Sequence, residues 1–286
     1  MNTTYNVLNR LIDKNNSNNP YDGFYHTYHI KQEGETFTQV SSPEEADHSF
    51  LGDWCHNAES CKIKEQMSHI SGGTVLDAGA CDGFFSLMFS SIGASVTSMD
   101  LTDREPRSLM HALLGVEDNF HHDNIYRYGK TGNKFDFVWC QDVLCHLQHP
   151  ILAIQNLRQV CSNKLYLGID RFKTETPEIE YLYQKESRTW SESRIEDISK
   201  SAAHFCDDTY TYVYTEDFII RQLEFNGFKN PHIKFSYHSK GANTMSGCGD
   251  RIIDVYEAEV DSEYKNILPA TNEIDYVADK NYEKTF

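Results

Sequence analysis

The chain has 286 residues, of which 39% are hydrophobic, and it carries a formal net charge of −17. This length and composition suffice for one large folded domain, or for one domain with an insertion. Proteins that bind phosphate backbones need clustered Lys and Arg, whereas the 26 basic residues here are scattered singly. A nucleic-acid partner is therefore disfavoured and a small-molecule substrate is favoured.

No apolar run is long enough to span a bilayer, and the N-terminus lacks the apolar core of a signal peptide. We therefore expect a cytoplasmic protein without a membrane partner. Its eight cysteines show no C-x-x-C pair and no regular spacing, which favours reduced thiols over a disulfide framework.

Residues 1–73 are expected to form a helical and irregular N-terminal cap. A first helix near residues 8–12 precedes an Asn-rich linker, and residues 21–57 are aromatic-rich and irregular. A helix is predicted near 59–70, because four residues that pack in cores recur on one side of it: Cys61, Ile63, Met67 and Ile70.

From residue 74, short β-rich apolar runs alternate with amphipathic segments of helical length: "TVLDA", "FFSLMFSSIG", "SVTSMD", "SLMHALLG", "FDFVWC", "ILAIQNLRQV" and "KLYLGID". Such alternation predicts an α/β fold with a mostly parallel sheet covered on both faces. The runs at 232–238 and 251–260 have no helix between them, so the sheet is expected to finish with an antiparallel hairpin. The predicted core spans 74–258, and an acidic C-terminal tail follows over 259–286.

Residues 171–214 interrupt the alternation with polar sequence rich in Tyr and Trp. Open α/β sheets bind ligands beyond the carboxyl ends of their strands, and this insertion begins at such an end. We therefore expect a lid. Its aromatic residues either line a substrate pocket or pack the insertion onto the core: Tyr183, Trp190, Tyr210, Tyr212 and Tyr214.

The stretch "TVLDAGACDGFF" at 74–85 is typical of a buried strand, a glycine turn and the start of a helix. It lacks the G-x-G-x-x-G spacing of a dinucleotide site, and the Asp77 carboxylate at the strand end would repel a pyrophosphate. Asp100 ends the next strand, 23 positions after Asp77, where an acid can accept hydrogen bonds from ribose hydroxyls. A ligand with hydroxyls and a cation suits this pair, and S-adenosylmethionine is such a ligand. The alternative is an ordinary α/β protein with capping aspartates.

Four stretches carry a resemblance to a known family: "VLDAGACDGFFS" at 75–86, "FDFVWCQDVLCHLQHPILAIQNL" at 135–157, "FYHTYHI" at 24–30 and "TEDFIIRQLEFNGF" at 215–228. The chain resembles class I S-adenosylmethionine-dependent methyltransferases, in the branch that includes the tRNA wobble-uridine carboxymethyltransferases. The resemblance implies a Rossmann-like, seven-stranded sheet with a reversed final hairpin and S-adenosyl-L-methionine as cofactor.

The same resemblance implies a set of cofactor-binding residues around the ends of the first four parallel strands. In it, Asp77, Gly79, Ala80, Gly83 and Phe84 line the cofactor, Asp100 and Leu101 hold the ribose, Asp123, Asn124 and Ile125 edge the adenine, and Gln141 lies beside the cofactor.

Two departures from the branch favour ordinary methyl transfer over carboxymethyl transfer to tRNA. Cys145 stands where the related motif usually has an aromatic residue. No residue before position 74 matches the basic residue that would read a carboxylated cofactor.

His146 is the main catalytic candidate, because it follows the fourth strand on the expected ligand side, where an imidazole can take a proton from an attacking oxygen or nitrogen. The alternative is that His146 braces the following helix. Tyr25 and His26 are further candidates, either closing over the cofactor or belonging to a segment that merely covers the sheet.

Two other classes of protein stay open. One is a non-catalytic cofactor-binding or regulatory protein with the same fold, and the other is a nicotinamide-dependent oxidoreductase, which the missing glycine pattern disfavours. Two groups of candidate metal ligands lack the paired spacing of a structural zinc site, so no metal is expected: Cys55, His56 and Cys61, and His121, His122 and Asp123.

Overall fold

The structure, a computed structural model, describes the backbone at residues 10, 27–32, 35–39, 49–50, 58–147, 149–171, 182–186, 210–239 and 251–264. Side chains are described at 10, 60–147, 149–171, 214–238 and 252–264. Of the helix expected near residues 8–12, only Arg10 belongs to this part, and it is helical. The predicted tail beyond Tyr264 lies outside the described residues.

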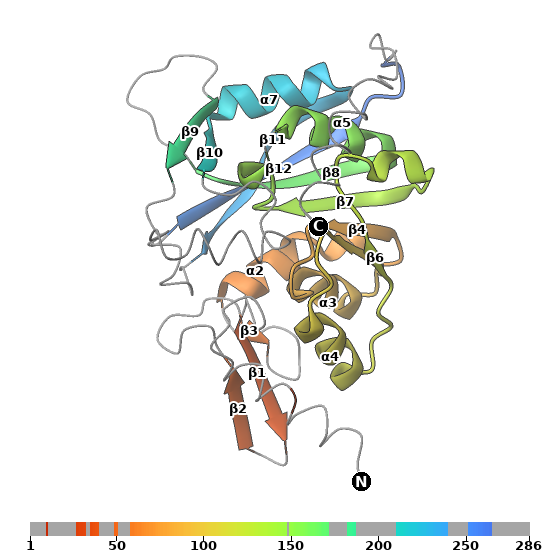
Figure 1. Ribbon diagram of the computed structural model, residues 1–286, viewed down its shortest axis with the longest axis vertical. Helices are drawn as coiled ribbons and strands as arrows, with labels where there is room; N and C mark the ends of the chain where they lie inside the picture. The colour runs from red at the N-terminus through yellow and green to blue at the C-terminus, as the bar shows by residue number, and fades with distance from the viewer. Residues whose placement is uncertain are drawn as a thin grey trace, which may run out of the picture.

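A seven-stranded sheet forms the centre of the molecule, in the order β11-β12-β8-β7-β4-β5-β6 (Figure 1). Its parallel strands are β4 (Thr74–Ala78), β5 (Ser95–Asp100), β6 (Phe120–His122), β7 (Phe135–Gln141) and β8 (Cys161–Asp170). β12 (Arg251–Val260) is antiparallel both to β8 and to β11 (Phe228–Ser239). The predicted mostly parallel sheet with an antiparallel final hairpin is confirmed.

Helices cover both faces of this sheet (Figure 1). On one face lie α2 (Ala58–Gln66), α3 (Phe84–Ser91) and α4 (Glu105–Leu114), whose apolar residues form one buried cluster with Trp139 and Tyr166 of the sheet. On the other face lie α5 (Pro150–Val160) and α7 (Glu216–Phe225), which enclose the second cluster with Leu165 and Leu167. Alternate residues of β8 thus point to opposite faces, as a strand buried on both sides requires.

The N-terminal part differs from the expectation of irregular structure. The described residues here form three short strands in one small sheet, β1 (Thr27–Gln32), β2 (Glu35–Gln39) and β3 (Ser49–Phe50), so the expectation of irregular structure is wrong for these three segments. The predicted helix near 59–70 is present as α2 and a 3-10 turn, η1 (Ser68–Ile70), with Ile63, Met67 and Ile70 buried.

Cys61 of α2 corrects two expectations. Its side chain is exposed rather than packed in the core, and it is disulfide-bonded, so the expectation of a reduced thiol is wrong there. Cys81, Cys140, Cys145 and Cys161 are free thiols.

The insertion after β8 contains an antiparallel pair, β9 (Leu182–Glu186) and β10 (Tyr210–Tyr214). β10 leads directly into α7, whose first turn is capped by Thr215: its side chain accepts the Phe218 N–H. The end of the insertion is therefore anchored to the core by a helix.

The strand order reverses between β4 and β7, because the chain runs outward from β4 through β5 to β6 and then returns to β7 on the other side of β4. Such a reversal opens a crevice at the carboxyl ends of the strands, where open α/β sheets bind ligands. Within the described residues, no helix is both long and apolar enough to cross a membrane.

Candidate active site

The glycine turn after β4 is fixed by close contacts on both sides. The N–H groups of Gly79 and Ala80 donate to the Met99 carbonyl at the end of β5, at 2.8 and 3.1 Å. Gly79 has φ +86°, and a Cβ at this position would lie 2.2 Å from Cγ2 of Val143. Only glycine allows both the left-handed backbone and the approach of the loop after β7.

Gly83, the residue before α3, has φ +82° and packs on a buried basic group. A Cβ at Gly83 would lie 2.7 Å from Cγ of Arg107. The Arg107 guanidinium contacts Asp103 at 2.7 Å, pairs with Asp118, and lies over the Phe120 ring. Burial lowers the pKa of the neighbouring His111. The turn therefore packs on a side chain that is itself held in place by two ion pairs and an aromatic ring.

Asp100, the last residue of β5, joins two backbone segments through one carboxylate. Its Oδ2 accepts the Cys81 N–H of the glycine turn at 2.8 Å, and its Oδ1 accepts the Thr102 N–H at 3.0 Å. Each carboxylate oxygen has a second lone pair, so this orientation leaves acceptor capacity for donors such as vicinal hydroxyls. The half-buried side chain of Asp100 is thus oriented in advance of any ligand.

Asp77 is held differently, because the residue is only 1% exposed. Ser86 of α3 donates its hydroxyl to Asp77 at 2.5 Å, and Ser98 of β5 donates to the Ser86 hydroxyl at 2.8 Å. Asp77 therefore ties β4, β5 and the first turns of α3 together. Ala80 and Phe84 are also buried, and Phe84 packs edge-on against Phe85.

The loop after β6 forms a further edge of the crevice, beside the glycine turn after β4 and the end of β5. The Asp123 N–H donates to the Asp100 carbonyl at 3.1 Å, and the Asp123 carboxylate accepts the N–H of Asn124 at 2.7 Å. Asn124 in turn accepts the Tyr126 N–H through its side-chain oxygen at 2.9 Å. Leu101 is linked to this edge through its carbonyl, which lies 2.6 Å from Nε2 of His122. Ile125, predicted to edge the adenine, is buried in the same loop.

Gln141 ends β7 directly opposite Gly168 of β8. Its side chain occupies the space that a Cβ at Gly168 would need, since that Cβ would lie 1.7 Å from Oε1 of Gln141. Oε1 is buried and has no hydrogen-bond partner within the described part of the chain. A buried amide oxygen without a donor is costly, so this atom indicates a place where a ligand can supply one.

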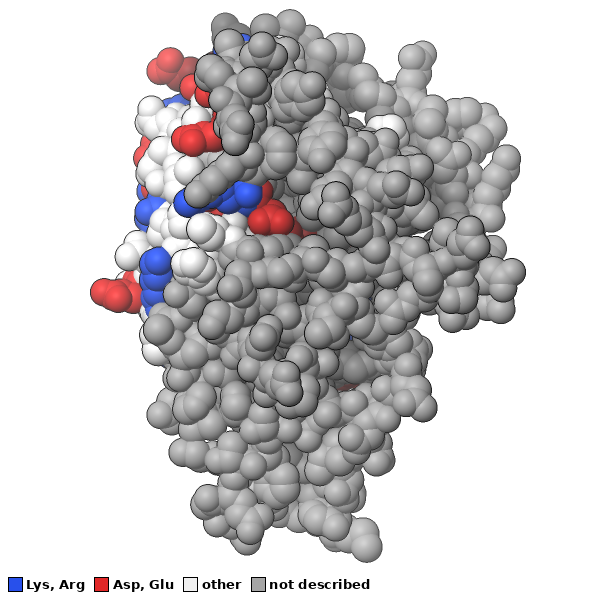
Figure 2. All heavy atoms as spheres, turned by 90° about the vertical axis from the view of Figure 1, so that its left-hand side faces the viewer, with Lys and Arg blue, Asp and Glu red and all other residues white. Residues whose placement is uncertain are grey.

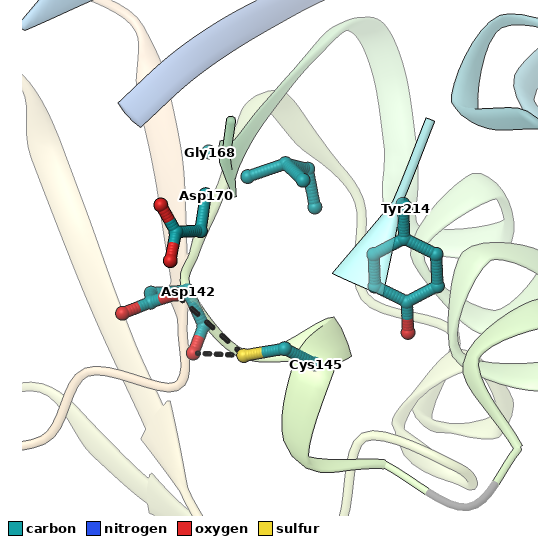
Figure 3. Close-up of a pocket in the computed structure, with 6 residues that line it drawn as sticks. Asp142, Cys145, Gly168, Asp170 and Tyr214 are labelled. Atoms are coloured by element: carbon teal, nitrogen blue, oxygen red, sulfur yellow. Dashed lines mark hydrogen bonds between the residues drawn. The ribbon is translucent and has the colours of Figure 1, made fainter. Parts of the chain in front are cut away.

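A small pocket lies beyond the ends of β7 and β8. We call it the strand-end pocket; its lining residues are Asp142, Cys145, Gly168, Ile169, Asp170 and Tyr214. Figure 3 shows Asp142 and Asp170 on one side and Tyr214 on the opposite side. Asp142 has φ +54°, and its N–H donates to the Gly168 carbonyl at 3.0 Å.

His146 closes the 3-10 turn η3 (Leu144–His146) next to this pocket and is partly buried. Its N–H donates to the Val143 carbonyl at 2.9 Å. Cys145, rather than His146, lines the strand-end pocket. Tyr25 and His26 lie outside the described residues, so their predicted roles stay predictions.

Sequence reasoning missed three polar or conformational features of the pocket, at Asp142, Gly168 and Asp170. Each stands at or just after a strand end, in "CQD" and "GID", and strand-end position is the signal that could have found them. Among the side chains that the structure describes, no three His, Cys, Asp or Glu residues converge as metal ligands.

Comparison with known proteins agrees with this fold. The model of the methyltransferase-domain family matches residues 56–233, so the chain belongs to that family. Together with the seven-stranded sheet, the match defines a class I S-adenosylmethionine-dependent methyltransferase.

The ubiquinone biosynthesis O-methyltransferase of Shewanella pealeana is 34% identical over 97 residues, which is 32% of this chain and 41% of that protein. The alignment thus spans less than half of the relative. Among solved structures, the N-terminal domain of EvdMO1 with bound SAH has a TM-score of 0.60 at 15% identity, covering 91% of this chain and 98% of that one. The 1,6-didemethyltoxoflavin-N1-methyltransferase of Burkholderia thailandensis has a TM-score of 0.50 at 16% identity, covering 71% and 79%. At these identities the structures show a shared fold.

Proposed function

We propose that the chain transfers a methyl group from S-adenosylmethionine to an oxygen, nitrogen or sulfur atom of a small molecule. The observation that carries the proposal is the Asp100 carboxylate, which two backbone N–H groups hold in place at the end of β5. A carboxylate so fixed, beside a glycine turn without dinucleotide spacing, suits the two hydroxyls of one ribose.

The residues around the crevice fit such a cofactor in distinct ways. Asp100 and Leu101 would hold the ribose, while Asp123, Asn124 and Ile125 would edge the adenine. The turn residues Gly79, Ala80 and Gly83 offer backbone to the methionine moiety. Phe84 and Asp77 are buried beneath the turn, so we propose that they support its shape. Gln141 offers a buried side-chain oxygen that has no hydrogen-bond partner among the described residues.

The bound cofactor supplies a methyl group on a cationic sulfur, which becomes a neutral leaving group. The protein then has to align the attacking atom and exclude water, which orientation can favour by several kcal/mol. We propose that the 171–214 insertion, which includes β9 and β10, acts as the lid. His146 would take a proton from an acceptor hydroxyl or amine, whereas a thiolate needs no base.

The charge of the chain supports a small acceptor rather than tRNA. On the described part of the face drawn in Figure 2, Lys and Arg lie among Asp and Glu, not in one continuous basic patch. The strand-end pocket is small, which suits a small group rather than a polymer. A phosphate-rich polymer would meet a chain with a net charge of −17.

Titration calorimetry of the full chain with S-adenosylmethionine, its demethylated product SAH, and NAD tests this proposal. We expect both sulfur compounds to bind and NAD not to bind. Binding of NAD alone would indicate an oxidoreductase, and binding of none would indicate a scaffold without this cofactor. Tight, saturable binding of tRNA at physiological salt would overturn the small-molecule acceptor.

A further inference from the structure

One buried side chain on α4 contacts the segments that lead to all three edges of the crevice. Arg107 is only 2% exposed. Its guanidinium donates to Asp103 in the loop after β5 at 2.7 Å and pairs with Asp118, two residues before β6. The same group lies over the ring of Phe120, the first residue of β6, at 3.7 Å from the ring centroid. The stem of Arg107 packs against Gly83 of the glycine turn, where an added Cβ would lie 2.7 Å from its Cγ.

Two of these contacts lead to the residues that we propose to hold the nucleoside of the cofactor. Asp103 directly follows Thr102, whose N–H fixes Oδ1 of Asp100 at 3.0 Å. Phe120 begins β6, and the end of β6 leads into the proposed adenine edge at 123–125. A displacement of the Arg107 guanidinium would therefore move the ribose acceptor and the adenine edge together.

Stability alone is a weak reason for this arrangement. Nε of Arg107 is buried and has no hydrogen-bond partner in the described part of the chain, and a buried N–H without an acceptor costs free energy. Apolar residues often replace buried ion pairs without loss of stability. A guanidinium offers something that an apolar side chain cannot, because its planar fork bonds two carboxylates in fixed directions. The geometry of Arg107 thus favours a role in orientation.

We propose that Arg107 is a positioning residue that sets the affinity of the crevice for S-adenosylmethionine, an inference that rests on the proposed methyltransferase function. Arg107 acts through other residues: through Asp103 on the loop after β5, and through Asp118 and Phe120 at the start of β6. Its effect on the cofactor is carried by the positions of these segments.

Titration calorimetry with SAH on the full chain, combined with urea unfolding, tests the proposal in two variants of Arg107. We expect Arg107→Gln to weaken SAH binding about tenfold, because the amide leaves both carboxylates without their cation. Arg107→Lys should weaken it only about threefold, since an ammonium keeps the charge but cannot bond two carboxylates as a planar fork.

Glu257→Gln is the control for loss of a buried ion pair. Glu257 of β12 is 6% exposed and contacts Lys164 at 2.8 Å and Lys234 at 2.7 Å. This variant should lower the free energy of unfolding but leave SAH affinity unchanged. A loss of affinity in folded Arg107→Gln that is absent in folded Glu257→Gln is then not a consequence of lower stability.

Asp103→Asn tests the same proposal with little risk to the fold. The Asp103 side chain is 60% exposed, and an exposed ion pair contributes little to stability. We expect SAH affinity to fall about threefold while the free energy of unfolding stays nearly unchanged. Glu65→Gln on the exposed side of α2 is the matched control, since it removes an exposed carboxylate outside the Arg107 contacts and should leave SAH affinity unchanged.

Two failures are distinguishable. Absence of SAH binding by the wild-type chain would remove the proposed function itself. If SAH binds the wild type and binds folded Arg107→Gln equally well, Arg107 only stabilises the fold, and the positioning proposal is wrong while the methyltransferase proposal stands. Should Arg107→Gln not fold, an unchanged affinity in Asp103→Asn overturns the positioning proposal in the same way.

Discussion

Asp100 Oδ2 accepts the backbone N–H of Cys81 at 2.8 Å, so the end of β5 and the glycine turn after β4 share one carboxylate. The second bond, from the Thr102 N–H to Oδ1, prevents the carboxylate from rotating without losing a partner. The proposed ribose acceptor and the shape of the turn are therefore coupled, so a substitution at one should also disturb the other.

Asp100→Asn should weaken binding of SAH by about 1 to 3 kcal/mol, because an amide N–H₂ then replaces one acceptor oxygen and faces a backbone N–H. Titration calorimetry measures the affinity, and thermal unfolding verifies that the variant is folded. Glu65→Gln serves again as a carboxylate-to-amide control on the exposed side of α2. If the folded Asp100→Asn variant binds SAH with unchanged affinity, Asp100 does not contact the ribose and has only a structural role at the end of β5.

Gly79→Ala should destabilise the fold for two separable reasons. The left-handed backbone costs about 1 to 2 kcal/mol, and the overlap with Val143 adds about 1 to 3 kcal/mol. Gly132→Ala is a matched control, since Gly132 has φ +76° and no atom within 4 Å of an added Cβ. The unfolding free energies in urea should rank wild type above Gly132→Ala and Gly132→Ala above Gly79→Ala.

Adding Val143→Ala to Gly79→Ala should recover part of the loss, because it removes the Val143 methyl group that would lie 2.2 Å from the new Cβ. Strict additivity of the two single changes would show that the turn and the loop after β7 do not touch in solution.

Glu257 of β12 should contribute to the free energy of unfolding at neutral pH, and this contribution should be lost in acid. Burial alone would raise the pKa of this carboxyl, but hydrogen bonds from Lys164 at 2.8 Å and Lys234 at 2.7 Å overcome burial and lower it from 4.5 to about 2. The native state then binds the proton less readily than the unfolded state. The stabilisation, up to about 3 kcal/mol, is present above pH 4.5 and is lost as the pH falls toward 2.

Urea unfolding at pH 7 and at pH 3 measures this contribution as the difference between wild type and Glu257→Gln. We expect a large difference at pH 7 that shrinks at pH 3, while other carboxyls titrate equally in both proteins. A difference that does not change with pH would mean that the two lysines leave the carboxyl at its ordinary pKa.

The variant His146→Ala distinguishes a catalytic role of His146, as the base that takes a proton, from a structural role in stabilising η3. If His146 takes the proton of a hydroxyl or amine acceptor, kcat should fall by about 10² to 10⁴ while SAH affinity stays nearly intact. If His146 instead braces η3, affinity for SAH and the melting temperature should fall together. Measuring all three quantities on one variant distinguishes the roles, once an acceptor is in hand.

The strands and helices of the core could be predicted because their apolar runs are long and regular. "TVLDA" and "SVTSMD" coincide with β4 and β5, and the final hairpin followed from the absence of a helix between two runs. β6 escaped prediction because "FHH" is short and polar at two of its three positions.

The pocket could be predicted less well, because it depends on register and backbone conformation. Gln141 lies over Gly168 only because β7 and β8 pair in that register, and nothing local in either strand specifies it. The left-handed backbone conformation of Asp142 could not be predicted from the sequence either, since Asp adopts positive φ only sometimes. The chain of hydrogen bonds from Ser98 through Ser86 to Asp77 could not be predicted either, because the two serines lie on other elements.

The two walls of the strand-end pocket are also the two ends of the insertion, since Asp170 closes β8 and Tyr214 closes β10. Each wall is fastened to the core on its own, Asp170 by pairing with Ile253 and Tyr214 by its bond to Leu144. The stretch between β9 and β10 can therefore diverge in length and composition during evolution without displacing either wall. Under the proposed function, the part of the chain that recognises the acceptor would be a separable module, which related enzymes could exchange without changing the part that binds the methyl donor.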